Sequence, residues 1–235
     1  MNVTLAAFLT LALAAPAAAQ TQQPTQPPRP AQPARPAQPP PPPLPPAEKY
    51  SFRPFFVASG QYFAASTTFN AAFGSAFQPF WGGGLEFVYK GNWFVDVTAS
   101  RFSKTGQRSF VYNGTTFPLG ISLTATDIAF ETTAGRRFRL RRHRKMTPYV
   151  GAGVGLYSYS EQSPFNDPSE NLDVTHAGFV LVGGVAFRVA KYVELSGDGQ
   201  YTYVPGILGT AGVSQQAGEN NLGGIAARFR VIVGK

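Results

Sequence analysis

Residues 192–203 read YVELSGDGQYTY, and polar and apolar side chains alternate along this stretch. In an extended chain, one face would carry the polar set Glu194, Ser196, Asp198, Gln200 and Thr202. The opposite face would carry Val193, Leu195, Gly197, Gly199, Tyr201 and Tyr203. The alternation predicts a β-strand as long as the about 9–11 residues with which a strand crosses a bilayer.

The preceding stretch repeats the pattern, with an apolar face of Phe179, Leu181, Gly183, Val185, Phe187 and Val189. Ala190 and Lys191 are short enough to form the hairpin turn between the two strands. A water-soluble barrel would bury the apolar face and expose the polar one. Long strands with carboxylates on the polar face favour the reverse arrangement, an outer-membrane barrel with polar side chains inside. A soluble exported barrel remains the alternative fold.

The chain has 235 residues, enough for one folded domain with extensions. Residues 1–19 are typical of a signal peptide, because an apolar run from Leu5 to Ala15 precedes the small-residue pattern Ala17-Ala18-Ala19. No later stretch has the ~18 continuous apolar residues that a membrane-spanning helix needs. Cysteine is absent, which excludes disulfides and thiolate metal sites.

Residues 20–50 form a proline-rich segment in which 13 of the 21 prolines lie between Pro24 and Pro46. Such a segment forms neither helix nor sheet and favours the extended polyproline II conformation. We interpret it as a periplasmic tail. It is either a semi-rigid spacer or a segment that contacts the cell wall or a periplasmic protein.

Residues 51–235 are predicted to form the barrel. Period-two patterns predict six further strands at Phe52–Ala65, Phe80–Lys90, Trp93–Phe102, Ile121–Phe138, Pro148–Ser160 and Leu222–Val233. Long loops are expected at residues 66–79, 103–120, 161–174 and 205–221, and they alternate with short turns. The predicted fold is all-β, an eight-stranded antiparallel up-and-down transmembrane β-barrel.

The runs PYVGAGVGLYSY (148–159) and GGVAFRVAKYVELSGDGQYTY (183–203) resemble the small eight-stranded outer-membrane barrels typified by outer-membrane protein A. This resemblance implies the outer membrane of a Gram-negative cell envelope as the location. It implies outer-membrane lipid and the barrel-insertion machinery as partners. The four long loops would then be extracellular.

Parity along the strands places a set of charged side chains inside the barrel. Its acids are Glu86, Asp96, Asp127, Glu131, Glu194 and Asp198, and its bases are Arg53, Lys90, Arg188, Arg228 and Arg230. The interior of an eight-stranded barrel is only wide enough to be filled by side chains. We therefore expect a network of lumenal ion pairs that plugs the barrel, with a narrow ion pathway as the alternative.

Seven of the 20 basic residues lie in one predicted periplasmic turn: Arg136, Arg137, Arg139, Arg141, Arg142, Arg144 and Lys145. A solvated turn is one interpretation, and binding of anionic lipid headgroups or cell-wall polymer is the other. Because the net charge of +8 is concentrated there, no nucleic-acid surface is expected.

No catalytic residue, metal site or cofactor is expected. The two histidines, His143 and His176, lack a neighbouring serine or second imidazole in the sequence. The predicted function is a non-catalytic outer-membrane barrel with a structural or surface-interaction role through its loops. A small, porin-like pore for ions or solutes is the alternative, and a lipid-modifying enzyme that uses His176 is a third hypothesis.

Overall fold

The structure, a computed structural model, describes residues 50–112, 115–138, 140, 145–163, 172–210 and 212–234. The predicted signal peptide and all of the proline-rich segment except Tyr50 lie outside these residues. Within the described ranges, the helices are too short and too polar to cross a membrane.

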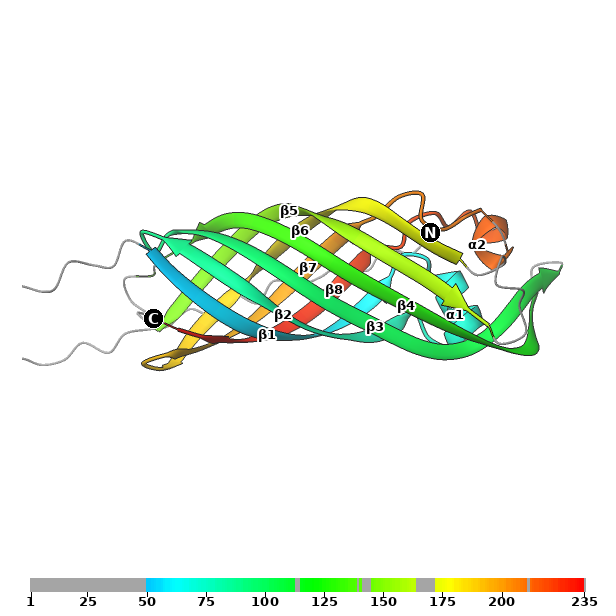
Figure 1. The fold of residues 1–235 in the computed structure, drawn as a ribbon, viewed down its shortest axis with the longest axis horizontal. Coiled ribbons are helices and arrows are strands. Elements are labelled where there is room, and N and C mark those ends of the chain that lie inside the picture. Colours follow the sequence, from blue (N-terminus) through cyan, green and yellow to red (C-terminus); the bar gives the residue numbers. More distant parts are fainter. Residues whose placement is uncertain are drawn as a thin grey trace, which may run out of the picture. The chain divides into compact units, whose positions relative to one another are not determined.

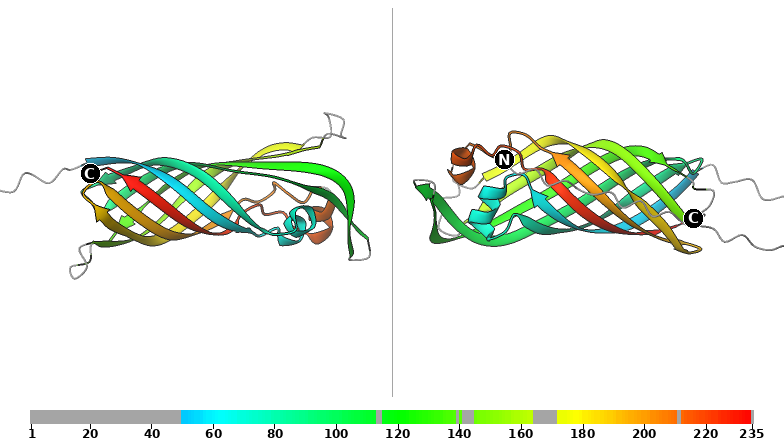
Figure 2. Two further views of the ribbon diagram at one scale, coloured as in Figure 1. Left: turned by 90° about the horizontal axis from the view of Figure 1, so that it is seen from below. Right: turned by 180° about the vertical axis from the view of Figure 1, so that it is seen from behind.

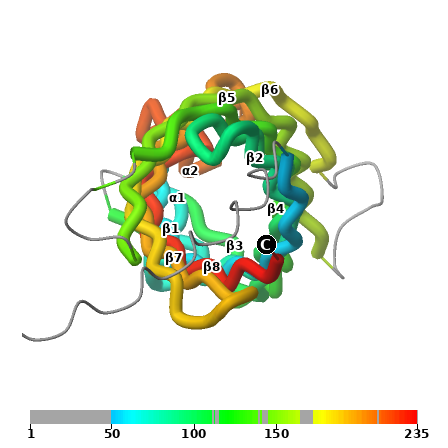
Figure 3. The backbone as a smooth tube through the Cα atoms, turned by 90° about the vertical axis from the view of Figure 1, so that its left-hand side faces the viewer, coloured from blue at the N-terminus to red at the C-terminus, as the bar shows by residue number. Residues whose placement is uncertain are grey.

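Eight antiparallel strands form one closed barrel in which each strand pairs with its neighbour in sequence and β1 pairs with β8 (Figure 1). The strands are β1 (Tyr50–Phe63), β2 (Phe77–Tyr89), β3 (Trp93–Tyr112), β4 (Thr115–Arg137), β5 (Met146–Gln162), β6 (Leu172–Ala190), β7 (Val193–Tyr203) and β8 (Gly224–Val233). Seen along its axis, the barrel is a continuous ring of strands (Figure 3). The fold predicted from alternation is confirmed.

The two ends of the barrel differ, and we name them by their connections. The turn end carries the start of β1, the end of β8 and the short connections after β2, β4 and β6. The loop end carries the long connections, with helix α1 (Ser66–Phe73) after β1 and helix α2 (Gly212–Ala217) after β7. Figure 1 shows both helices at the same end of the barrel.

The β3–β4 connection differs from the expected loop over residues 103–120. Both strands continue through this stretch, so that Gln107 pairs with Ser122 and Phe110 with Phe117. The resulting hairpin extends past the other strands at the loop end (Figure 2). Beyond the barrel wall neither face of a hairpin has to be apolar, so the alternation that reveals a membrane strand is lost there.

The β2–β3 connection is a tight turn of three residues, Lys90 to Asn92. Lys90 and Gly91 have positive φ angles of 49° and 66°, and the backbone N–H of Asn92 donates to the carbonyl oxygen of Tyr89. Positive φ at both central positions matches the right-handed twist of the strands it joins. The predicted strands end at Lys90 and begin again at Trp93, which leaves only Gly91 and Asn92 for this turn; in the structure Lys90 also belongs to it.

The outer face of the barrel is apolar around its middle. Exposed side chains there include Leu85, Val154, Leu156 and Leu181. Exposed aromatic residues lie toward both ends, with Tyr50, Phe52, Trp93 and Tyr192 near the turn end and Tyr62, Phe77, Trp81 and Tyr203 near the loop end. An apolar band between two aromatic girdles is the surface that membrane barrels present to lipid.

Glycines on the inner face make room for large side chains. A Cβ atom at Gly135 or Gly151 would lie 2.6 Å or 2.9 Å from the ring of Phe94, which points into the barrel from β3. The buried Phe94 and Tyr149 rings pack edge to face beside them, with ring centroids 5.8 Å apart. The glycine alternation in β5 therefore reflects a narrow, filled interior.

Candidate functional site

Near the turn end, four buried charges form a closed cluster. Arg53 from β1 and Arg137 from β4 lie between Glu86 of β2 and Glu194 of β7. Each arginine forms an ion pair with both glutamates; Arg137 is 3.0 Å from Glu86, and Arg53 is 3.3 Å from Glu194. We call these four residues the turn-end cluster. The two positive and two negative charges balance, so the net charge of the cluster is zero.

A second group of charges, the central cluster, consists of Arg228, Arg230, Asp96, Asp198 and Glu131. Arg230 is almost fully buried and pairs with Asp96 at 2.7 Å and Asp198 at 3.2 Å. Its guanidinium also lies between the rings of Phe55 and Tyr149, at 5.2 Å and 5.1 Å. Salt bridges and ring contacts together hold this side chain across the barrel.

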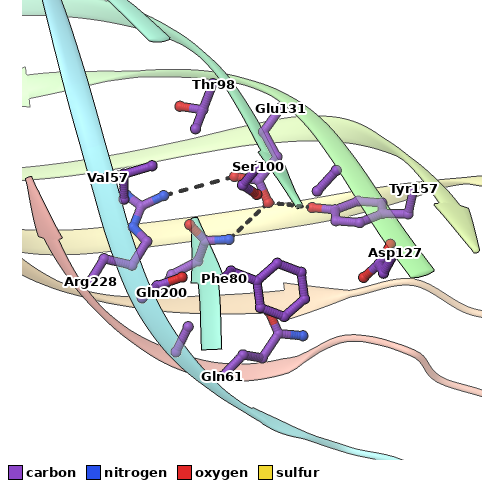
Figure 4. Close-up of a pocket in the computed structure, with 13 residues that line it drawn as sticks. Val57, Gln61, Phe80, Thr98, Ser100, Asp127, Glu131, Tyr157, Gln200 and Arg228 are labelled. Atoms are coloured by element: carbon purple, nitrogen blue, oxygen red, sulfur yellow. Dashed lines mark hydrogen bonds and ion pairs between the residues drawn. The ribbon is translucent and has the colours of Figure 1, made fainter. Parts of the chain in front are cut away.

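Glu131 is the point where the central cluster meets neutral hydrogen-bonding groups (Figure 4). Its carboxylate accepts hydrogen bonds from the Tyr157 hydroxyl at 2.7 Å and the Gln200 amide at 2.8 Å, and Arg228 lies 3.8 Å away. Asp127 is equally buried but has no ion-pair partner among the described residues, and its Oδ1 has no hydrogen-bond partner. The cavity that these residues line has a volume of about 20 Å³, room for roughly one water molecule.

Toward the loop end, the lumen is filled by apolar side chains, which we call the loop-end plug. It combines inward residues of the strands with residues of the long connections: Phe63, Phe69, Ala76, Phe80, Phe102, Ala125, Tyr159, Val180, Val204, Ile207, Leu208 and Leu222 are among its members. Phe69 of α1 stacks on Phe63 of β1, with ring centroids 3.8 Å apart. The loops thus fold back into the mouth of the barrel.

A carboxylate joins two of these loops. Glu219 follows α2 and accepts hydrogen bonds from the backbone N–H groups of Thr67 and Thr68, both at 2.8 Å, and from the Thr68 hydroxyl at 2.7 Å. Helix α1 has no side-chain cap of its own at Ala65. Glu219 therefore supplies the cap from about 150 residues away in the sequence, a separation of 151 positions from Thr68. No local sequence signal predicts this contact.

The structure places most, but not all, of the expected lumenal charges inside the barrel. Those that point inward and form ion pairs are Glu86, Asp96, Glu131, Glu194, Asp198, Arg53, Arg228 and Arg230. Asp127 is inside without such a partner. Sequence reasoning did not assign Tyr149, Tyr157 and Gln200 to this network, although Gln200 lies on the polar face of its predicted strand.

Two expected lumenal bases lie elsewhere. Lys90 is exposed in the β2–β3 turn, where its Nζ lies over the Tyr89 ring at 5.1 Å. Arg188 is exposed near the end of β6, where the register shifts between Arg188 and Ala190. Parity fails at both positions because each lies at the barrel rim, where a side chain can turn toward solvent.

The basic turn is also corrected. Arg137 is not a turn residue but the last residue of β4, with its side chain in the turn-end cluster. Arg136 is exposed, with its guanidinium 5.6 Å from the centre of the Trp93 ring, and Lys145 is an exposed turn residue. Arg139, Arg141, Arg142, Arg144 and His143 lie outside the described residues.

His176 is half-buried on β6 at the loop end. Its Nδ1 lies 3.2 Å from the carbonyl oxygen of Pro205, and in the described part of the chain no hydrogen bond joins it to a serine or a carboxylate. Within the same residues no group of three or more His, Asp and Glu side chains could hold a metal ion. The geometry around His176 is that of a histidine tethering a loop to a strand.

No protein-family model matches the chain, and no characterised protein matches it in sequence. Several solved structures are similar to it. Neisserial surface protein A is 13% identical with a TM-score of 0.44, and the match covers 79% of this chain and 94% of that chain. Ail, the attachment invasion locus protein of Yersinia pestis, is 14% identical with a TM-score of 0.42, covering 79% and 95%.

The N-terminal β-barrel domain of Pseudomonas aeruginosa OprF is 11% identical with a TM-score of 0.41, and the match covers 78% of this chain and 97% of that domain. These similarities are low. The fold is instead identified by features of the chain itself, namely its strand order, its antiparallel register and its apolar outer face. By these features, the chain has the fold of the small eight-stranded outer-membrane β-barrels.

Proposed function

We propose that this protein is a closed outer-membrane scaffold that displays an interaction surface at its loop end and carries out no catalysis. The observation that carries the proposal is the filled lumen. Ion pairs occupy its turn-end and central parts, and apolar loop residues occupy its mouth. The cavity beside Glu131 has room for only about one water molecule, which supports a closed scaffold for the loops and not a passage for solutes.

The apolar outer band supports the membrane location. A water-soluble protein seldom exposes a contiguous apolar patch of more than a few hundred Å². Here the exposed outer face includes Leu85, Val154 and Leu181 between the two aromatic girdles. The cations over aromatic rings at the turn end, such as Arg136 over Trp93, suit a lipid headgroup region, where long basic side chains reach the polar surface.

A small pore is the alternative function, and conductance separates the two. The purified barrel in planar bilayers is expected to show no stepwise current at neutral pH, because a pathway would have to pass both charge clusters and the loop-end plug. Reproducible unitary currents that change when Arg228→Ala is introduced would overturn the closed scaffold. A barrel that carries an open lumen of known conductance serves as the positive control.

Display of the loop end can be tested in intact cells that express the protein. Because the chain has no cysteine, Thr210→Cys at the loop end and Lys191→Cys at the turn end each introduce one unique thiol. A membrane-impermeant maleimide is expected to label Thr210→Cys in intact cells and Lys191→Cys only after the outer membrane is opened. The opposite pattern would place the loop end in the periplasm and contradict the proposed display.

A further inference from the structure

Beside the loop-end plug lies a cavity of about 420 Å³, which we call the loop-end cavity. Its walls come from α1, from the parts of β3 and β4 near the loop end, from the end of β5, from the start of β6 and from the segment that contains α2. Small-molecule sites in proteins occupy roughly 300–1,000 Å³. The cavity is thus at the lower end of the range for a bound organic ligand.

One side of the cavity is apolar. Leu123, Ile207, Leu208 and Val213 line it and are themselves buried, and Leu119 stands half-exposed at its border. These side chains belong to two separate parts of the chain, β4 and the connection that contains α2, so the apolar wall depends on that connection folding against β4. Such a wall favours a hydrocarbon group over a sugar or a nucleotide.

Arg108 of β3 also lines the cavity and is half-buried. Among the described residues it has no ion-pair or hydrogen-bond partner, whereas the Glu161 carboxylate already accepts a hydrogen bond from the Tyr159 hydroxyl at 2.6 Å. The hydroxyl groups of Thr68 and Ser109 are likewise engaged, with Glu219 and with the Ala71 carbonyl. Together with the exposed Gln107 and Thr210, the guanidinium therefore remains available to a ligand, and among these three it is the group that carries a charge.

A partly desolvated arginine next to an apolar wall is complementary to a molecule with an anionic head and an apolar tail. We propose that the loop-end cavity binds a single-chain anionic amphiphile of the fatty-acid class, with its carboxylate at Arg108 and its chain against Leu123, Ile207 and Leu208. The volume accommodates one short or medium chain and not the several chains of a membrane lipid.

This inference rests on the proposed function in taking the loop end as the ligand-binding face, and it names the ligand class. The binding test uses purified full-length protein, so it does not depend on which side of the membrane the loop end faces. Failure of cell-surface labelling with intact binding would overturn the display alone. Failure of binding with intact labelling would overturn the cavity proposal alone.

The test is equilibrium dialysis of radiolabelled decanoate against lipid nanodiscs that contain the barrel, with empty nanodiscs of the same lipid content as the baseline. Saturable excess binding of about one decanoate per chain is expected. Arg108→Gln should weaken it about tenfold or more, the effect of losing a charge-assisted hydrogen bond of at least 1.4 kcal/mol. Arg101→Gln is the matched control, because Arg101 lies on the same strand but on its exposed outer face.

A second variant tests the apolar wall. Leu123→Trp should fill part of the cavity and abolish binding of both decanoate and decanol, while the heat-dependent shift of the folded barrel on a gel verifies that it still folds. Decanol should bind the unaltered protein at least tenfold more weakly than decanoate. The proposal is overturned by the absence of saturable excess binding, by equal affinity for decanol, or by an Arg108→Gln variant that binds as well as Arg101→Gln.

Discussion

Arg137 is one residue whose paired charge is expected to stabilise the interior of the barrel. Its guanidinium contacts both Glu86 and Glu194, and the three groups are buried together with Arg53. Arg137→Gln leaves two buried carboxylates to share one arginine. Loss of one member of a buried ion pair typically costs about 3–5 kcal/mol, so unfolding of the barrel by urea in lipid vesicles should shift to clearly lower urea.

The neighbouring residue provides the control for this prediction. Arg136 is exposed on the opposite face of β4, and its contact is with the Trp93 ring. Arg136→Gln should change the free energy of unfolding by no more than about 1 kcal/mol. Equal unfolding midpoints for the two variants would mean that the turn-end cluster does not stabilise the barrel.

The position of Arg137 was available in the sequence but was not used. Asp127 and Glu131 had been assigned to the inner face by parity, and Arg137 is an odd-numbered residue of the same strand. The density of basic residues after it favoured a turn instead. The alternation of faces also placed Lys90 and Arg188 wrongly inside the barrel. Inner and outer positions alternate strictly only where the backbone is paired with both neighbouring strands.

At the scale of elements, the contact between Glu219 and the start of α1 connects the first and last long loops. Burial alone would raise the pKa of Glu219, but the hydrogen bonds from the Thr68 hydroxyl and from the Thr67 and Thr68 N–H groups outweigh it and lower the pKa. At pH 7, Glu219→Gln should therefore speed hydrogen exchange in α1 about fivefold, the effect of removing a helix cap.

The sign of the pH dependence follows from that lowered pKa. A carboxyl group whose pKa is lower in the folded state stabilises the contact above its unfolded value of about 4.3, and this stabilisation is lost as the pH falls through the folded value. The difference between Glu219→Gln and the unaltered protein should hence disappear in acid well below pH 4. Asp173→Asn, at an exposed loop-end position, is the control and should show no difference at any pH.

The same loops mark the limit of what the sequence could predict. All eight strands were predicted, because a membrane imposes a strict two-residue alternation on each. Helices α1 and α2 were not, because they have eight and six residues and gain their stability from contacts such as Phe69 with Phe63. The loop-end cavity depends on how these loops pack, which no local pattern encodes.

At the scale of the whole molecule, the barrel is inverted relative to a soluble protein. Charged and polar groups occupy its centre, apolar loop residues close one end, and the outer wall between the aromatic girdles is hydrocarbon. The outer wall fits a lipid environment, since its exposed apolar side chains would otherwise face water. The surrounding solvent is thus as much a determinant of this fold as its own contacts.

The outer wall gives a direct test of that conclusion. Val154 lies near the middle of β5 and is 56% exposed on the outer face. If lipid covers it, Val154→Arg should destabilise the inserted barrel by about 2–4 kcal/mol, whereas Thr115→Arg, on the hairpin beyond the barrel wall, should cost about 0–1 kcal/mol. Urea unfolding in vesicles, followed through the fluorescence of Trp81 and Trp93, measures both. A soluble barrel would instead tolerate arginine at Val154 as well as at Thr115, and equal stabilities of the two variants would exclude a lipid-facing wall.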